Sequence, residues 1–244
     1  MNKNTPVTLF IQCIIDSLYP EVAEAMVTVL ERLGFKVVCP PDQTCCGQPA
    51  YNSGYHAEAR AAARHFLRVF RDAQVIVCPS GSCVNMVRHH YGNLFAPDTE
   101  FKALAGRIAA RTFEFTEFLV DVINIESVGA RYNGSVTYHD SCHLLRGIKV
   151  AEQPRKLIKK VIGLDFIEMN NSDRCCGFGG AFSAKYPEIS TAMVDEKAHH
   201  IIKSKADAVI GCDMGCLMNI KGRLNRIGSD IKVRHIAQLL AGEM

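Results

Sequence analysis

Eight of the eleven cysteines in this chain form two matched sets of four. Each set consists of a single cysteine, then an adjacent Cys-Cys-Gly sequence, then a second single cysteine. Members of the second set lie 129 to 133 residues after their counterparts, and this nearly constant displacement indicates an internal duplication. The first set is Cys13, Cys45, Cys46 and Cys83, and the second is Cys142, Cys175, Cys176 and Cys216.

Four thiolates in one pocket suit either an iron–sulfur cluster or a zinc ion. Structural zinc sites usually use two short Cys-x-x-Cys pairs, whereas here an adjacent pair lies between two distant single cysteines. Because successive side chains tend to diverge, we expect the paired thiols to reach different iron atoms of one cluster. Gly47, Gly177 and Gly179 follow these pairs, and we expect them to let the backbone approach a cluster and donate N–H groups to its sulfurs.

The composition is that of a folded globular chain, with 244 residues, 48% hydrophobic and 22% charged. The net charge is +3 without a long basic run, so nucleic-acid binding has no electrostatic footprint. We find no secretory signal sequence and no apolar stretch of about 18 residues, and therefore predict a cytoplasmic chain without a membrane span. Cytoplasmic thiols stay reduced, so the cysteines predict metal or redox sites rather than a disulfide framework.

Short apolar strands alternate with longer amphipathic helices in both halves, which predicts parallel βα units. In the first half we expect strands at Val7–Ile11, Phe35–Cys39 and Gln74–Cys78, and helices at Tyr19–Leu33 and Ala57–Asp72. In the second half we expect strands at Ser135–Tyr138, Asp165–Met169 and Ala208–Gly211, and helices at Gln153–Ile162, Pro187–Lys203 and Met214–Asn225. Each half ends in a similar helix, at Phe115–Val120 and at His235–Leu240.

The expected fold is therefore α/β, with two Rossmann-like βα halves that have parallel sheets and are related by a pseudo-twofold axis. Gly and Asn cluster at Val128–Gly134, which places the boundary between halves of residues 1–130 and 131–244. The segment before the terminal helix is longer in the first half, so we expect an insertion within Tyr91–Arg111. Ligands of such sheets bind beyond the carboxyl ends of the strands. The cysteines follow the strands there, so each set should converge at one sheet edge.

The motifs around the cysteine pairs resemble those of a known family. Thr44–Pro49 (TCCGQP) and Arg174–Gly180 (RCCGFGG) are similar to the two CCG motifs of the cysteine-rich domain family. That family includes the B subunit of heterodisulfide reductase and the iron–sulfur subunit of glycolate oxidase. Pro79–Cys83 (PSGSC), Tyr138–His143 (YHDSCH) and Cys175–Phe182 (CCGFGGAF) resemble its lactate-utilisation subfamily in particular. The resemblance extends over essentially the whole chain.

The chain departs from the family pattern at the last pair of cysteines in each half. Where the family has Cys-x-x-Cys, the first position is Ser80 in one half and Asp213 in the other. The five-cysteine cluster of heterodisulfide reductase therefore does not carry over directly. Four cysteines remain in each half, which implies a [4Fe–4S]-type cluster, up to two per chain. Ser80 and Asp213 stay candidate oxygen ligands.

The resemblance implies an iron–sulfur redox subunit of a cytosolic complex that oxidises L-lactate to pyruvate. It would act with two other lactate-utilisation subunits, one of them with ferredoxin-type clusters. Since the reaction releases two electrons and two protons, it needs a base as well as clusters. His139 and His143 flank Cys142 and are the candidate bases, and Arg146 and Arg174 are candidates to bind a carboxylate. The alternative roles are hydrogen bonding near the cluster and neutralisation of its charge.

Two other functions stay open on the sequence alone. One is a thiol–disulfide oxidoreductase like heterodisulfide reductase, against which the missing cysteines at Ser80 and Asp213 count. The other is a zinc-stabilised scaffold subunit, which the same thiols could support. Among the three remaining cysteines, we expect Cys39 in the core, and core or accessory roles for Cys78 and Cys212.

Overall fold

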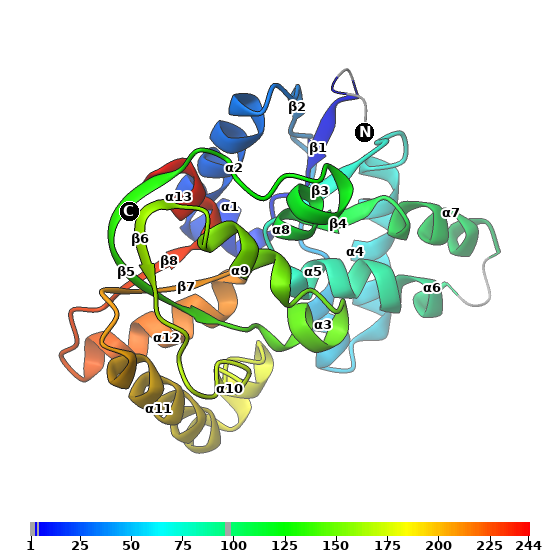
Figure 1. Cartoon of the computed structure of the whole chain (residues 1–244). Coiled ribbons are helices and arrows are strands. Elements are labelled where there is room, and N and C mark those ends of the chain that lie inside the picture. The colour runs from blue at the N-terminus through cyan, green and yellow to red at the C-terminus, as the bar shows by residue number, and fades with distance from the viewer. Residues whose placement is uncertain (1–2, 4, 96–98) are drawn as a thin grey trace.

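The computed structural model describes residues 3, 5–95 and 99–244 and contains two four-stranded sheets, one in each half (Figure 1). All strand pairs are parallel. The strand order is β2-β1-β3-β4 in one sheet and β6-β5-β7-β8 in the other, so the two halves are structural repeats. The strands are β1 (Val7–Leu9), β2 (Val37–Val38), β3 (Ile76–Cys78), β4 (Thr112–Glu114), β5 (Arg131–His139), β6 (Ile162–Phe166), β7 (Ala208–Gly211) and β8 (Lys232–His235).

Three of the four central strands are short, mainly apolar runs whose residues are all buried. Every residue of β1 (VTL), β3 (IVC) and β7 (AVIG) is buried, whereas the outer strands β2 and β6 are partly exposed. Such burial is typical of parallel sheets covered by helices on both faces. Because all strands of a sheet run the same way, the loops that follow them meet at one edge.

Helices connect the strands and cover the sheets. Pro20 and Pro187 lie in the first turns of α2 and α11, where the missing N–H has no intrahelical partner to lose. None of the described helices is long and apolar enough to cross a membrane. The α-helices are α1 (Cys13–Leu18), α2 (Pro20–Arg32), α3 (Gln48–Asn52), α4 (His56–Val69), α5 (Gly81–Asn85), α6 (Tyr91–Leu94), α7 (Thr99–Ala109), α8 (Phe115–Glu117), α9 (Glu152–Ile158), α10 (Ala181–Lys185), α11 (Pro187–Ser204), α12 (Met214–Arg226) and α13 (Ile236–Ala241), and the π-helical turns are η1 (Met86–His90), η2 (Phe118–Val122) and η3 (His143–Gly147).

The α/β class and the paired parallel sheets are confirmed, and most predicted elements lie within a few residues of the observed ones. Strands β4 and β8 are not among the predicted elements, because each is three or four residues long and leads directly into the terminal helix of its half. Strand β6 begins at Ile162, before the predicted Asp165–Met169, because Arg131 at the start of β5 already pairs with it. Helices α6 and α7 account for the extra segment within Tyr91–Arg111, of which residues 96–98 lie outside the described residues.

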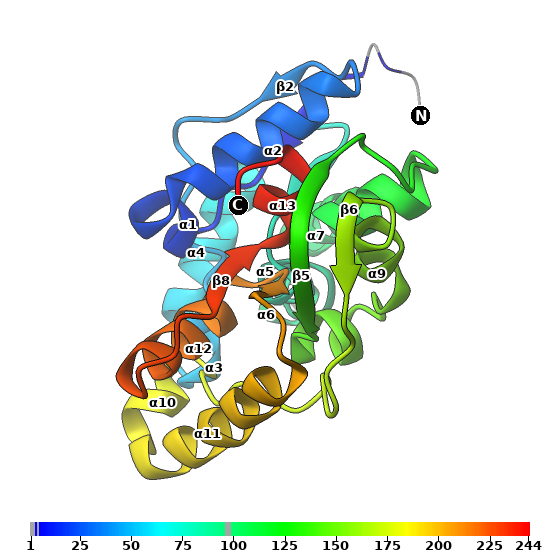
Figure 2. The same cartoon turned by 60° about the vertical axis from the view of Figure 1, so that its left-hand side comes forward.

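The two halves pack directly against each other. The C-terminal helix α13 lies along α2 of the first half (Figure 2), where Arg32 donates hydrogen bonds to the carbonyls of Leu240 and Ala241. Near the opposite ends of the strands, Gly81 of α5 lies against Leu144 of η3, and a Cβ on Gly81 would be 2.7 Å from Leu144 Cβ. This close approach brings the helix that contains one cysteine of the first set next to the loop that follows β5.

Candidate metal centre

All eight cysteines of the two sets line one cavity of about 160 Å³ between the halves. Cys13 begins α1 after β1, and Cys83 lies in α5 after β3. In the second half, Cys142 directly precedes η3 after β5, and Cys216 lies in the first turn of α12 after β7. The Cys-Cys pairs lie in the loops before α3 and α10. The parallel sheets therefore bring both sets to the carboxyl edges of the strands, as predicted.

The thiols of the first set contact one another in sequence order. The Sγ atoms of Cys46 and Cys83 are 3.4 Å apart. The Cys45 thiolate accepts hydrogen bonds from the thiols of Cys13 and Cys46, which lowers the pKa of Cys45 to about 3. Donation to that thiolate in turn raises the pKa of Cys13. Neighbouring sulfurs thus share protons, and metal binding would replace these shared protons because only the thiolate is a ligand.

The second set repeats this arrangement. The Cys175 thiolate accepts hydrogen bonds from the thiols of Cys142 and Cys176, which lowers the pKa of Cys175 to about 2. Hydrogen bonding to Cys175 and Cys216 raises the pKa of Cys176. The two adjacent thiols of each pair therefore converge, contrary to the expectation that successive side chains diverge. Both sulfurs of a pair face the same cavity.

The glycines that follow the pairs donate to the sulfurs, as expected for a loop that surrounds a metal–thiolate centre. The N–H of Gly47 lies 3.4 Å from Cys45 Sγ, and the N–H of Gly177 lies 3.4 Å from Cys175 Sγ. These bonds turn each loop back on its first cysteine and stabilise negative charge on that sulfur.

The absence of a side chain at these glycines serves helix packing. Gly47 and Gly177 have left-handed φ angles of +84° and +80°. A Cβ on Gly177 would lie 2.6 Å from the carbonyl oxygen of Ser190 in α11, and one on Gly47 would lie 3.1 Å from that of Ala59 in α4. The backbone at Gly47 and Gly177 therefore closely approaches a helix, α4 or α11. Gly179, with φ +51°, lines the cavity itself, and its role toward a cofactor stays a prediction.

Ser80 and Asp213, the candidate oxygen ligands, meet across the interface between the halves. Ser80 Oγ donates to Asp213 Oδ2 at 3.3 Å and accepts from the N–H of Cys83 as the N-cap of α5. Asp213 Oδ2 also accepts from the N–H of Ser82 at 3.0 Å, and burial raises the pKa of Asp213. Asp213 lines the cavity and Ser80 does not. Their role as ligands stays a prediction.

The candidate bases and arginines lie at different depths. His143 lines the cavity, with Nδ1 3.8 Å from Cys142 Sγ. His139 is 1% exposed at the end of β5, and burial lowers its pKa to about 3. The side chains of Arg146 and Arg174 are 60% and 62% exposed and do not line the cavity. Catalytic roles for all four stay predictions.

The three cysteines outside the sets are divided between core and surface. Cys78 and Cys212 are fully buried. The thiol of Cys78 hydrogen bonds to Cys83, and Cys212 Sγ lies 3.3 Å from the hydroxyl of Tyr138. The prediction of a core position for Cys39 is wrong, since Cys39 follows the exposed edge strand β2 and is itself exposed.

Several cavity residues, among them Gln12 and Ser141, are not among the site residues predicted from the sequence. Gln12 and Ser141 precede the first cysteine of each set and line the cavity. The side chain of Gln12 caps α1 by accepting from the N–H of Ile14 at 2.9 Å. Glutamine is not a typical N-cap residue, so only its place beside Cys13 in the repeat could have identified it.

A buried carboxyl group at the end of β4 is a further residue that the sequence did not reveal. Glu114 caps α8 by accepting from the N–H groups of Thr116 and Glu117, and it also accepts from the Thr116 hydroxyl. Its Oε1 has no hydrogen-bond partner among the described residues. Burial raises the pKa of Glu114 to about 8.

This shift makes the stability of the apoprotein depend on pH. Between the ordinary pKa of 4.5 and about 8, the folded state retains a proton that the unfolded state has lost, so stability falls as pH rises. We expect the free energy of unfolding of the wild type, relative to Glu114→Gln, to fall by about 4 kcal/mol from pH 4.5 to pH 8. Urea titrations of the wild type and Glu114→Gln at several pH values, under anaerobic, reducing conditions, measure this difference in the free energy of unfolding. A difference between the two proteins that is independent of pH would contradict the prediction.

Comparison with known proteins places this site in a family. The model of the cysteine-rich CCG domain matches residues 7–88 and 136–221. The chain is 51% identical over 234 residues to lactate utilization protein A of Geobacillus kaustophilus, covering 96% of this chain and 98% of that protein. It is 46% identical over 234 residues to lactate utilization protein A of Oceanobacillus iheyensis, covering 96% of each. This chain belongs to the lactate utilization protein A branch of the CCG family.

Each CCG match contains one complete set of four cysteines, so each family domain coincides with one set of candidate ligands. Among solved structures, a hypothetical protein from Helicobacter pylori superposes with a TM-score of 0.68 and 10% identity. The match covers 99% of this chain and 49% of that one, and shows a shared fold.

The residues of the CCG domains fit the iron–sulfur cluster that the family resemblance implies. Each set presents four thiols to one cavity, two of them as an adjacent pair, and thiolates are the preferred ligands of iron–sulfur clusters. In each set at least one thiol is already favoured as the thiolate, and a backbone N–H donates to Cys45 in the first set and to Cys175 in the second. Thiolates also bind zinc, so the donor set suits either an iron–sulfur cluster or zinc, and metal analysis distinguishes the two.

Proposed function

We propose that this chain is an iron–sulfur redox subunit of a cytosolic complex that oxidises L-lactate to pyruvate. The observation that carries the proposal is the convergence of eight thiols on one cavity, in a chain 51% identical to a lactate utilization protein A. The proposed occupants are [4Fe–4S]-type clusters, one for each set of four. The apolar sheets and helices around the cavity hold the thiols in place.

Oxidation of lactate to pyruvate removes two electrons and two protons from the substrate. A bound iron–sulfur cluster accepts electrons one at a time. The two cysteine sets face the same cavity, so the chain offers one acceptor site for each electron. The N–H groups of Gly47 and Gly177 stabilise the negative charge of the sulfurs to which they donate.

Among the candidate bases, His143 is the better placed to take a proton. Its ring lines the cavity beside Cys142, whereas His139 is enclosed behind the sulfurs and binds protons weakly because of burial. Arg146 and Arg174 lie at the surface, paired with Asp173 and with Glu196. We therefore place any binding of a carboxylate by these arginines at the surface of the complex and outside the cavity.

The proposed partners are two other lactate-utilisation subunits, one of them with ferredoxin-type clusters. Electrons that reach the cavity must leave it through a second carrier, since the described cysteines outside the two sets are single and offer no third four-thiol site. A subunit with ferredoxin-type clusters supplies such a carrier.

Complementation in a host that carries this gene tests the proposal. Deletion of the gene is expected to abolish growth on L-lactate as sole carbon source, and to remove lactate-dependent dye reduction from anaerobic cell extracts. A plasmid copy should restore both, and growth on pyruvate should be unaffected throughout because pyruvate enters metabolism after the proposed step. Normal growth of the deletion strain on L-lactate would contradict the proposal.

A further inference from the structure

The two halves differ in what lies behind their cysteine sets. In the first half, the rings of Phe10 and Phe66 pack edge to face, with centroids 4.7 Å apart, and both side chains are buried. In the second half the corresponding positions are His139 and Lys197, which are 1% and 0% exposed. An apolar aromatic pair has thus been replaced by an imidazole and an amine.

The correspondence between these positions follows from the repeated fold. Leu9 pairs with Val77 in β1 and β3, and Tyr138 pairs with Ile210 at the equivalent place in β5 and β7, so Phe10 corresponds to His139. The glycine contacts show which residues of α4 and α11 correspond. Gly47 lies against Ala62 of α4, and Gly177 lies against Met193 of α11, so Ala62 and Met193 are equivalent. Four residues later in each helix come Phe66 and Lys197, which are therefore equivalent as well.

The buried amine is satisfied by hydrogen bonds. Lys197 Nζ donates to the carbonyl oxygens of Asn171 at 2.7 Å and Ser172 at 3.0 Å, in the loop that leads to Cys175.

The buried imidazole is less well satisfied. Among the described residues neither Nδ1 nor Nε2 of His139 has a partner in good hydrogen-bond geometry, and the one weak contact is with the backbone of Ser172, whose carbonyl already accepts from Lys197 Nζ. Burying polar atoms without well-placed partners is unfavourable, so a ligand for at least one nitrogen would offset that cost. In the first half the equivalent Phe10 has no polar atom to satisfy.

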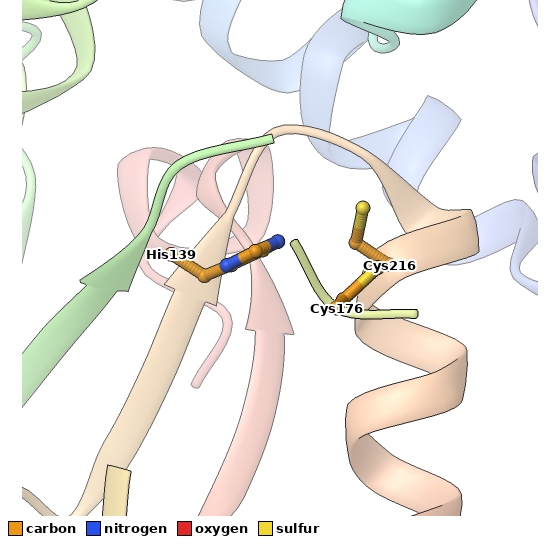
Figure 3. A group of neighbouring side chains, drawn as sticks. All are labelled: His139, Cys176 and Cys216. Atoms are coloured by element: carbon orange, nitrogen blue, oxygen red, sulfur yellow. The ribbon is translucent and has the colours of Figure 1, made fainter. Parts of the chain in front are cut away.

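Two sulfurs of the second set lie close enough to the ring to bind the same metal centre as His139. A ring nitrogen of His139 and the Sγ atoms of Cys176 and Cys216 all lie within 4.8 Å of one another, and Figure 3 shows the ring extending toward both cysteines. Two donors on one metal atom lie roughly 3.3–3.8 Å apart, given metal–donor distances of about 2.0–2.3 Å. A side-chain adjustment of roughly 1 Å would bring the imidazole nitrogen to that separation from one of these sulfurs, so that an iron already bound by a thiolate would take His139 as its second protein ligand and the fifth protein donor of the cluster.

We propose that His139 is a metal ligand of the second-half centre, which thereby becomes a mixed imidazole–thiolate site, while the first-half centre is bound by thiolates alone. This inference rests on the proposed function, in that the metal is the iron of the cluster. Imidazole ligation of iron–sulfur clusters is chemically established and changes their electronic properties. The two centres of the chain are then inequivalent despite their matching cysteines.

Nitrogen hyperfine spectroscopy of the whole chain tests this proposal. The chain is purified anaerobically from cells fed natural or ¹⁵N-labelled histidine, reduced, and measured by pulsed EPR. We expect a strongly coupled imidazole nitrogen whose signal changes with the label. His139→Phe, which introduces the residue of the first half, should lose that signal and release about half of its iron to a chelator at least ~10-fold faster than the wild type. His199→Phe, on the exposed face of α11, is the matched control and should do neither.

The outcomes separate this inference from the proposed function. A wild-type chain with iron and labile sulfide but no strongly coupled nitrogen overturns His139 ligation and leaves the proposed function standing. A nitrogen signal that persists in His139→Phe overturns it as well, because another histidine is then the ligand. A chain with no iron overturns both. Since absence of the coupling in the labelled wild type is enough to overturn the proposal, misfolding of the variant would not rescue it.

Discussion

Replacing Cys175 with serine is expected to remove the second-half iron–sulfur centre and leave the first in place. Cys175 accepts hydrogen bonds from both of its neighbours in the set, and its pKa is lowered to about 2, so it is the thiolate around which the set is organised. A serine hydroxyl is a far poorer ligand for iron than a thiolate. Iron and acid-labile sulfide per chain should therefore fall by about half, and growth on L-lactate should be lost.

Cys39→Ser is the matched control for this variant. Cys39 is exposed and belongs to neither set, so its replacement should change neither the iron content nor growth. Cys45→Ser should reproduce the loss of half the iron from the first half, because Cys45 has the equivalent position there. Full iron content in Cys175→Ser would contradict the assignment of the ligands. Full growth of Cys175→Ser on L-lactate with half the iron would show that lactate oxidation does not need the second centre.

Substituting Gly177 by alanine is expected to destabilise the chain by about 2–4 kcal/mol. The left-handed φ of +80° costs an alanine roughly 1–2 kcal/mol. Its Cβ would also lie 2.6 Å from the carbonyl oxygen of Ser190 and 3.1 Å from Met193 Cβ, so the loop must move away from α11. That movement would also break the 2.8 Å hydrogen bond from the Ser190 hydroxyl to the carbonyl of Gly177.

Gly129→Ala is the control that distinguishes backbone strain from the steric clash with α11. Gly129 has a similar φ of +72°, but a Cβ there meets nothing within 4 Å. Its substitution should cost only the backbone strain, roughly 1–2 kcal/mol. Urea unfolding of the reduced apoproteins measures both free energies, and iron reconstitution should be impaired in Gly177→Ala alone. Equal destabilisation by the two substitutions would show that contact with α11 does not set the conformation of the CCG loop.

The sequence was sufficient to predict the parts of the fold that depend on periodic patterns. The constant displacement between cysteine sets predicted the repeat, and buried apolar strands alternating with helices predicted two parallel sheets. Parallel strands end at one edge, which is why residues as distant as Cys13 and Cys83 lie in the same cavity. Strands β4 and β8 escaped prediction because a run such as Thr112–Glu114 has too few residues to show a pattern.

Other features of the site depend on tertiary contacts that no local pattern encodes. Lys197 lies in an amphipathic helix among charged residues, and its burial follows from the carbonyls that α11 meets in the fold. The poor hydrogen bonding of His139 likewise depends on how the described residues around it are arranged in the fold. Cys39 was misplaced for the opposite reason, because the apolar Val37–Val38 before it forms an edge strand that is partly exposed.

Metal and sulfide analysis of the anaerobically purified chain tests the central claim most directly. We propose that the eight thiols of the cavity hold iron–sulfur clusters, and we therefore expect iron and acid-labile sulfide in equal amounts, about eight of each per chain when both sites are filled. The visible spectrum should show broad absorption that bleaches on reduction. Stoichiometric zinc with no labile sulfide, from a chain kept free of oxygen throughout, would contradict the claim and identify the cavity as a structural zinc centre.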